Sequence, residues 1–282
     1  MRWRGRRQSS NVEDRRGQSI IRSKRGVGGG AAILLIIVGL LFGEDVQQVL
    51  SVFVGTPSQQ AQQQSRPQAT QAQNDEAAQF VSTILAETED TWSAVFASAG
   101  QRYQPPKLVL YEGQVSSACG LNSAASGPFY CPGDFQIYID LSFLDDLKQM
   151  GASGDFAFAY VIAHEVGHHI QNITGIASDV RQQQSRSSQV QSNALSVKME
   201  LQADCFAGIW INHTQKRSAI LEPGDIEEGI NAAEAVGDDT IMRRAGRAPR
   251  RENFTHGSSQ ERISWFQQGM QTGNIQACQT FG

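Results

Sequence analysis

The pattern of apolar and polar positions divides the chain into one apolar run, a polar linker and a long patterned region. Residues 26–43 (GVGGGAAILLIIVGLLFG) are 18 positions without a charge, and a bilayer core of about 30 Å needs roughly 17–25 apolar residues as a helix. Residues 44–74 are rich in Gln and Ala, and such a segment buries too little apolar surface to order itself. We therefore predict a transmembrane helix over 26–43, a linker over 44–74 and a folded domain over 75–282.

Inside the predicted domain, apolar residues recur at three- and four-residue spacings, which is typical of amphipathic helices. Short runs rich in β-branched and aromatic residues indicate strands. We predict helices over residues 75–97, 141–150, 155–173, 197–213, 225–236 and 258–269, and strands over 107–111 and 135–140. The polar stretch 178–196 is expected to be a surface excursion. Because helices outnumber strands, the pattern favours an α+β fold, mostly helical with a small sheet.

Charge is distributed unevenly along the chain. Residues 1–25 carry nine Lys and Arg against Glu13 and Asp14, whereas the remainder is net acidic. A basic arm can bind nucleic acid, but this one directly precedes the apolar run, where positive charge marks the cytoplasmic side. We therefore expect a basic cytoplasmic tail over 1–25, an exported domain at the cell membrane and no nucleic-acid partner. The alternative is a cleaved signal peptide, which the sequence after residue 43 disfavours because it lacks a small-x-small cleavage site.

Four cysteines fit an exported domain. Cys119 and Cys131 are 12 positions apart in a turn-rich stretch, and Cys205 and Cys278 are far apart. An even number of cysteines in an oxidising compartment indicates two disulfides, although four cysteines permit three pairings. We predict the short-loop pair Cys119–Cys131, which leaves Cys205–Cys278. A zinc site made of the four thiolates is a poor fit because the chain has no C-x-x-C pair.

The strongest chemical signal is the run His164-Glu165-Val166-Gly167-His168. Positions i and i+4 of a helix lie on one face, so both imidazoles can reach one cation. Glu165 can then act on a metal-bound water as a general base, which is the H-E-x-x-H arrangement of zinc peptidases. The alternative is two core histidines with an incidental Glu, but a buried carboxylate beside them would be costly without a cation.

A catalytic zinc needs a third protein ligand and an open position. The downstream candidates are His169, Glu200, Asp204, His213 and His256. His169 points about 100° away from His168 around the helix. Glu200 and Asp204 share one face of the next helix, so one carboxylate can bind zinc while the other accepts the free ring N–H of a ligating histidine. The alternative for these two residues is an ordinary solvated acidic face.

Four segments of the chain, which include these motifs, resemble a known protein family. The segments HEVGHHIQN, MELQADCFAG, HGSSQERISWFQQG and GPFYCPGDFQIYIDLSF resemble the neutral zinc metallopeptidase family of bacteria. More distantly, H-E-x-x-H, E-x-x-A-D and H-x-x-x-x-E-R are similar to gluzincins such as the heat-shock membrane peptidases, from which the chain differs in having one predicted span. The resemblance implies a zincin-like domain with His164, His168 and Glu200 as zinc ligands, Glu165 as base, Asp204 behind a ligand and His256 as a transition-state donor.

Together these observations predict a zinc-dependent peptidase that hydrolyses peptide bonds with a metal-activated water and acts on a polypeptide. The strand over 135–140 is expected to bind an extended substrate at a sheet edge. Two alternatives stay open: an amidase acting on cell-wall peptides, and a zinc-stabilised receptor or scaffold domain without catalysis. The presence of Glu165 disfavours the scaffold, since a structural site has no use for it. For His256 the alternative is a structural histidine that caps a helix start. The substrate specificity and the oligomeric state are not determined by the sequence.

Overall fold

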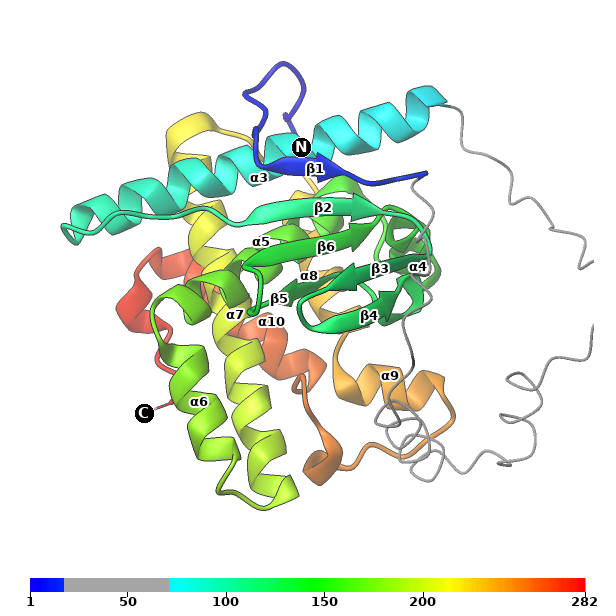
Figure 1. The fold of residues 1–282 in the computed structure, drawn as a ribbon, viewed down its shortest axis with the longest axis vertical. Helices are drawn as coiled ribbons and strands as arrows, with labels where there is room; N and C mark the ends of the chain where they lie inside the picture. Colours follow the sequence, from blue (N-terminus) through cyan, green and yellow to red (C-terminus); the bar gives the residue numbers. More distant parts are fainter. Residues whose placement is uncertain (18–70, 282) are drawn as a thin grey trace, which may run out of the picture. The chain divides into compact units, whose positions relative to one another are not determined.

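Two short apolar segments, β2 (Lys107–Tyr111) and β6 (Gln136–Asp140), pair in parallel at the centre of a four-stranded sheet (Figure 1). The computed structural model describes residues 1–17 and 71–281. The sheet order is β1-β2-β6-β5, in which β1 (Val12–Asp14) is parallel to β2 and β5 (Phe129–Cys131) is antiparallel to β6. Strands β3 (Gln114–Ser117) and β4 (Gly120–Ser123) form a separate antiparallel hairpin.

The side chains of the central strands alternate between two faces of the sheet, as the period of two requires. One face enters the main core with the helices and consists of Leu108, Leu110, Ile137 and Ile139. The other face consists of Val109, Tyr111 and Tyr138. It forms a smaller core with Val115 of β3 and Cys131 of β5. The sheet is therefore buried on both sides.

The described part of the chain contains eight α-helices. They are α3 (Gln71–Ser98), α4 (Phe143–Gln149), α5 (Asp155–Ile173), α6 (Ile176–Gln184), α7 (Gln189–Ser218), α8 (Asp225–Ala235), α9 (Asp238–Arg244) and α10 (Ser259–Thr272). Short 3-10 turns are at Ala124–Ser126, Arg251–Asn253 and Ile275–Ala277. Helix α5 is buried along most of its length, packed against α3, α7 and α8, and α7 in turn packs on α10. A central apolar helix is thus held from several sides.

The first turn of α5 is stabilised from outside the helix. The residue before it is Gly154 at φ 119°, and a Cβ at this position would lie 2.0 Å from the carboxyl carbon of Glu228. Glu228 uses this space to accept a hydrogen bond from the backbone N–H of Phe156 at 3.0 Å. The N-cap position is Gly154, which makes no side-chain capping hydrogen bond, so a carboxylate from α8 serves the first turn instead.

Several predictions of local structure are confirmed. The fold is α+β, mostly helical with a small sheet, and the bounds of α5 and β2 match the predicted 155–173 and 107–111. The segment 178–196 lies largely at the surface, as predicted, but most of it is helical, because α6 and the first turns of α7 occupy it. Ser188 starts α7 with a capping box to Gln191, a polar signal of helix initiation.

Both predicted disulfides are present. Cys119–Cys131 joins the turn between β3 and β4 to strand β5. Cys205–Cys278 joins the middle of α7 to the C-terminal segment. In the described residues, no cysteine is free.

Two predictions of organisation need correction. Residues 1–17 are not a separate tail, because they belong to the same folded unit as residues 71–281, with β1 hydrogen-bonded to β2. The predicted substrate-binding strand over 135–140 is not at a sheet edge, because β6 lies between β2 and β5. The predicted span over 26–43 lies outside the described residues, and none of the described helices is long and apolar enough to cross a membrane.

Helices α7 and α10 approach each other through glycines. A Cβ on Gly208 would lie 2.1 Å from the carbonyl oxygen of Phe266 and 2.5 Å from the backbone nitrogen of Met270. A Cβ on Gly269 would lie 1.9 Å from the carbonyl oxygen of Cys205. Backbone atoms cannot move aside without separating the two helices.

We therefore expect Gly208→Ala to lower the melting temperature of the full chain by roughly 6–12 °C, since overpacking of this kind costs about 3 kcal/mol or more. Thermal unfolding followed by circular dichroism measures the change. Gln182→Ala, on the exposed face of α6, is the control and should shift the midpoint by less than about 2 °C. A Gly208→Ala protein as stable as the parent would contradict the close packing.

Candidate metal centre

The centre forms where α5 crosses α7. Gly167 of α5 faces Ala203 of α7 so closely that a Cβ on Gly167 would lie 2.9 Å from the carbonyl oxygen of Ala203 and 3.0 Å from its Cα. The residues on either side of Gly167 therefore face the residues around Ala203. This crossing brings His164 and His168 of α5 opposite Glu200 of α7.

The three side chains converge at distances that suit one metal ion. The Nε2 atom of His164 lies 3.1 Å from Oε2 of Glu200, and Nε2 of His168 lies 3.4 Å from Oε1 of the same carboxylate. Their ligand atoms all lie within 4.8 Å of one another. In a tetrahedral zinc site with ligands at about 2.1 Å, neighbouring donor atoms are roughly 3.4 Å apart. The spacing and the two imidazoles with one carboxylate therefore fit zinc.

The other ring nitrogen of each histidine is held by a hydrogen bond. Nδ1 of His164 lies 2.7 Å from Oδ1 of Asp204, and Nδ1 of His168 lies 2.9 Å from Oε1 of Gln171. A carboxylate accepts, and Gln171 uses its amide N–H groups on the carbonyl of Met199 and on Gln202, so both Nδ1–H groups donate. Each Nε2 then faces Glu200 and is the nitrogen that a metal would take in place of its proton, while Nδ1 keeps its hydrogen.

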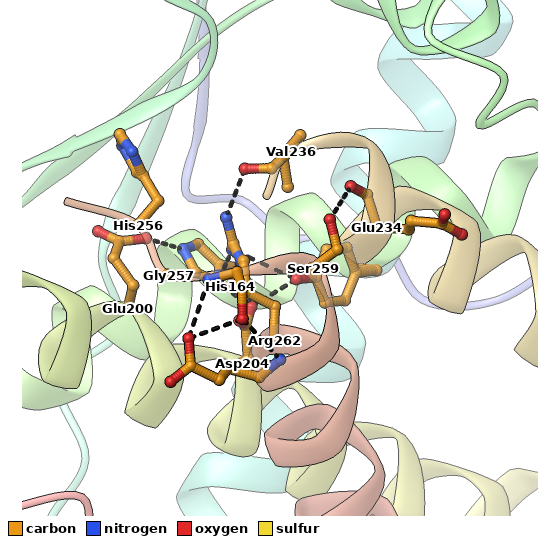
Figure 2. A network of polar contacts seen from close by, with 12 residues as sticks. His164, Glu200, Asp204, Glu234, Val236, His256, Gly257, Ser259 and Arg262 are labelled. Carbon is orange, nitrogen blue, oxygen red and sulfur yellow. Dashed lines mark hydrogen bonds and ion pairs between the residues drawn. The ribbon is translucent and has the colours of Figure 1, made fainter. Parts of the chain in front are cut away.

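Behind His164, Asp204 is the centre of a buried polar network (Figure 2). Arg262 of α10 donates to both of its oxygens, from Nε to Oδ2 at 2.8 Å and from Nη2 to Oδ1 at 2.9 Å. The hydroxyl of Tyr160 donates to Oδ1 at 2.5 Å. Such a bidentate, charge-assisted pair has a fixed geometry, so Asp204 and the ring of His164 are oriented by three different helices.

The charges of this site favour a bound cation. Burial lowers the pKa of His164, but the charge and hydrogen bonds of Asp204 and Glu200 raise it more, to about 10. Burial raises the pKa of Glu200, but the charges of His168 and His164 lower it well below its usual value. Once the imidazoles are neutral, the carboxylates of Glu200 and Asp204 exceed the one guanidinium of Arg262 by one negative charge, which a divalent ion can take up. Metal binding then displaces the protons from the imidazoles.

A cavity of about 550 Å³ opens onto these side chains. Glu165 lines it and is only 7% exposed. Within the described residues, no hydrogen bond holds the Glu165 carboxylate. Much of the remaining wall is apolar and includes Phe129, Phe143, Val161, Ala177 and Val180. The cavity therefore combines a free carboxylate, a metal-type ligand set and room for an apolar side chain.

His256 also lines this cavity. Its imidazole is 52% exposed and its Nδ1 lies 3.2 Å from Oδ1 of Asp238, whose hydrogen bond raises the pKa of His256. The loop itself is held by Oδ2 of Asp238, which accepts from the backbone N–H groups of Thr255, His256 and Gly257 at 2.7, 2.7 and 3.0 Å. The N-cap of α10 is Ser258, so His256 does not cap this helix.

The two remaining histidines lie away from the centre. His169 donates from Nε2 to the carbonyl of Gln104 at 2.7 Å and contacts the Tyr130 hydroxyl through Nδ1 at 3.1 Å. Burial lowers its pKa to about 4. His213 donates from Nε2 to the carbonyl of Gly273 at 2.8 Å. Both are structural, so the structure joins His164, His168 and Glu200 and leaves these two candidates outside.

Sequence reasoning missed four residues of the site. Tyr160 is four positions before His164 on the same helix, and Gln171 is three positions after His168, so helical spacing alone could have indicated both. Arg262 stands inside the H-x-x-x-x-E-R motif, but nothing local shows that it reaches Asp204. Asp238 carried no motif signal, because its role is to hold a loop from another part of the chain.

Comparisons with known proteins agree with this picture. Residues 1–281 match the family described as "Putative neutral zinc metallopeptidase". The chain is 48% identical over 288 residues to the "Uncharacterized protein YpfJ" of Escherichia coli K12, covering 100% of this chain and 99% of that protein. It is 40% identical over 217 residues to the "Uncharacterized protein Rv2575" of Mycobacterium tuberculosis H37Rv, covering 73% and 72%. No solved structure is significantly similar.

We expect Arg262→Met to lower the melting temperature by roughly 10 °C and to weaken zinc retention. Removing the guanidinium leaves the wholly buried Asp204 unpaired, and breaking such a pair costs about 3–5 kcal/mol. The matched control is Arg251→Met, which breaks an exposed pair with Glu261 worth at most about 1 kcal/mol. Thermal unfolding and zinc content are measured for both. Equal losses in the two variants would contradict the assigned role of Arg262.

Proposed function

Because the chain belongs to the neutral zinc metallopeptidase family, we propose that it is a zinc-dependent peptidase whose metal is held by His164, His168 and Glu200. The observation that carries this proposal is the convergence of two Nε2 atoms and one carboxylate at 3.1 and 3.4 Å. Among the described residues, the group offers three protein ligands. A structural zinc is enclosed by four, so three ligands beside a cavity favour a catalytic site.

The residues around the centre have separate tasks in peptide hydrolysis. A bound zinc supplies a Lewis acid and lowers the pKa of a water toward about 7. Glu165 is buried in the cavity without a hydrogen bond from the described residues, so its carboxylate is available to accept a proton from the attacking water and to pass it to the leaving amine. Asp204 and Gln171 hold the two imidazoles in the ligand tautomer.

His256 is the proposed donor to the oxyanion that develops on the scissile carbonyl. It lines the cavity wall on a loop that Asp238 fixes through three backbone hydrogen bonds. The hydrogen bond that His256 donates to Asp238 raises the pKa of His256, which favours the charged, donating form of the imidazole. A preorganised donor of this kind stabilises the transition state more than the substrate.

The substrate is proposed to be a polypeptide bound in extended form along β5. This strand is at the edge of the sheet, and its residues Phe129 and Tyr130 line the cavity. An extended peptide can pair with a free strand edge through its backbone while side chains enter pockets. The apolar wall formed with Val161, Ala177 and Val180 favours an apolar side chain next to the cleaved bond.

The two other functions that the sequence leaves open are less well supported. A scaffold would have no need for a buried Glu165 that faces the cavity. An amidase acting on cell-wall peptides would use the same ligands and base, so it is distinguished by substrate and not by the centre. The two disulfides support an oxidising, exported location for the domain. Attachment to a membrane through residues 26–43 stays a prediction; because β1 pairs with β2, such an attachment would have to leave residues 1–17 on the same side as the domain.

We expect Glu165→Gln to abolish cleavage of casein or of a mixed peptide library by the full-length protein. The substitution keeps the size of the side chain but removes the base, which typically costs roughly 10²–10⁴-fold in rate. Zinc content and melting temperature should stay close to those of the parent, because Glu165 is not a ligand in this proposal. Glu200→Ala is the contrasting variant and should lose zinc as well as activity. A Glu165→Gln protein that cleaves like the parent would refute the hydrolytic mechanism.

We expect His256→Ala to lower the cleavage rate by roughly 10²–10³-fold, as the loss of one transition-state donor does, while zinc content and melting temperature are retained. Retention is expected because the loop is held by backbone groups and not by the imidazole. Asp238→Ala is the control and should lower the melting temperature by destroying the loop. Unchanged activity in His256→Ala would show that the imidazole does not contribute to catalysis.

A further inference from the structure

The first 17 residues, which we call the arm, are joined to the rest of the described chain by backbone hydrogen bonds. Strand β1 pairs with β2 in the register Val12–Leu108 to Asp14–Leu110. Further along the arm, the N–H of Ser9 donates to the carbonyl of Ser82 in α3 at 3.0 Å. The arm therefore adds a strand to the sheet and is also held on the helix that flanks it (Figure 1).

The arm also contributes to the main core. Trp3 is only 6% exposed, and its ring meets that of Phe80 edge to face at a centroid distance of 5.3 Å. Phe80 in turn stacks on Phe158 of α5 at 6.1 Å. A buried tryptophan of this kind is typical of a folded segment and not of a solvated tail.

The arginines of the arm are matched by carboxylates. Arg6 lies 3.2 Å from Glu87, and Arg7 lies 2.9 Å from Glu89 and 2.7 Å from Asp90, all on α3. Both glutamates are largely buried. The remaining ion pairs of the arm are Arg2–Glu222, Arg4–Glu76, Arg15–Glu13 and Arg16–Asp14. Four of the six arginines of the arm thus pair with carboxylates outside it, whereas Arg15 and Arg16 pair with carboxylates of the arm itself.

The amino group of Met1 lies in an acidic pocket at the start of the metal-centre helix. It is 3.0 Å from Asp155, 3.2 Å from Glu222 and 3.3 Å from Asp225. Asp155 is the first residue of α5, which carries His164 and His168 further along. The arm is therefore in direct contact with the helix on which the centre is built.

From these contacts we infer that the arm is a docked part of the metal-centre domain, folds in the same compartment as residues 71–281, and carries Arg4, Arg6 and Arg7 to bind α3 and not to orient a membrane span. Paired strands are only about 4.8 Å apart, whereas a bilayer core is about 30 Å thick. A single crossing by residues 26–43 would separate β1 from β2 and expose Trp3. The cytoplasmic position expected for residues 1–25 is thus incompatible with an exported domain in this fold. This inference does not rest on the peptidase function.

The compartment is tested by labelling single cysteines in the full-length protein. The native cysteines of the described chain are disulfide-bonded, so Ser10→Cys in the arm and Gln182→Cys on α6, both at exposed positions, are separately addressable. A membrane-impermeant maleimide is applied to right-side-out and to inverted vesicles. We expect both cysteines to react in the same preparation, with a labelling ratio near one. Labelling of the two positions in opposite preparations would overturn the inference.

The role of the arginines is tested by two variants that remove the same charge. Arg6→Gln with Arg7→Gln removes docking contacts to α3, whereas Arg22→Gln with Lys24→Gln removes two charges outside the described residues. We expect only the first variant to lower the melting temperature, by several degrees, and neither to change the side on which position 182 is labelled. If the second variant alone moves that label to the other side, the basic residues act as a topology signal and the inference fails.

Substitution of Trp3 tests whether the arm packs on the rest of the protein. Trp3→Ala in the full chain should lower the melting temperature by roughly 10 °C, since truncating a buried tryptophan removes a large apolar contact. Gln8→Ala, at an exposed position of the arm, should leave the midpoint within about 2 °C. A Trp3→Ala protein with an unchanged midpoint would show that the arm is not docked in solution.

Discussion

The close crossing of α5 and α7 at Gly167 is the constraint on which the rest of the site depends. Because Gly167 has no side chain, the backbone of α7 at Ala203 comes within van der Waals contact of α5. Two histidines one turn apart then face a carboxylate on the opposite helix at 3.1 and 3.4 Å. A bulkier residue at this point would separate the donor atoms by an amount comparable to the tolerance of a metal site.

Buried charge is the second organising feature, and it follows from that crossing. Burying Glu200 and Asp204 close together is unfavourable unless cations compensate them. Arg262, delivered by α10, compensates Asp204 permanently. The remaining negative charge is available for a divalent ion. A fixed ion pair that orients His164 thus stands next to a separate group of residues that could hold a metal ion.

In the arm, too, carboxylates of the fold are compensated by cationic side chains from a distant part of the chain. Its arginines face acidic residues of α3, and its tryptophan reaches the ring of Phe80 and, through it, α5. Helix α5 is thus stabilised both by the arm at the start of the chain and by α7 and α8, which come later in it. In sequence these arginines look like a topology signal, because their partners are about 80 positions away.

Sequence alone determined what depends on neighbouring positions: helix 155–173 from its period, the pairing of His164 and His168 on one helix face from their i, i+4 spacing, and the α+β class from the order of elements. Tertiary structure decided what depends on distant positions. Strand β5 at the sheet edge, Arg262 on Asp204 and the docking of residues 1–17 all join segments far apart in the chain. Local periodicity reports which face of an element is apolar. It does not report which partner that face meets, because the free energy of such contacts depends on packing in three dimensions.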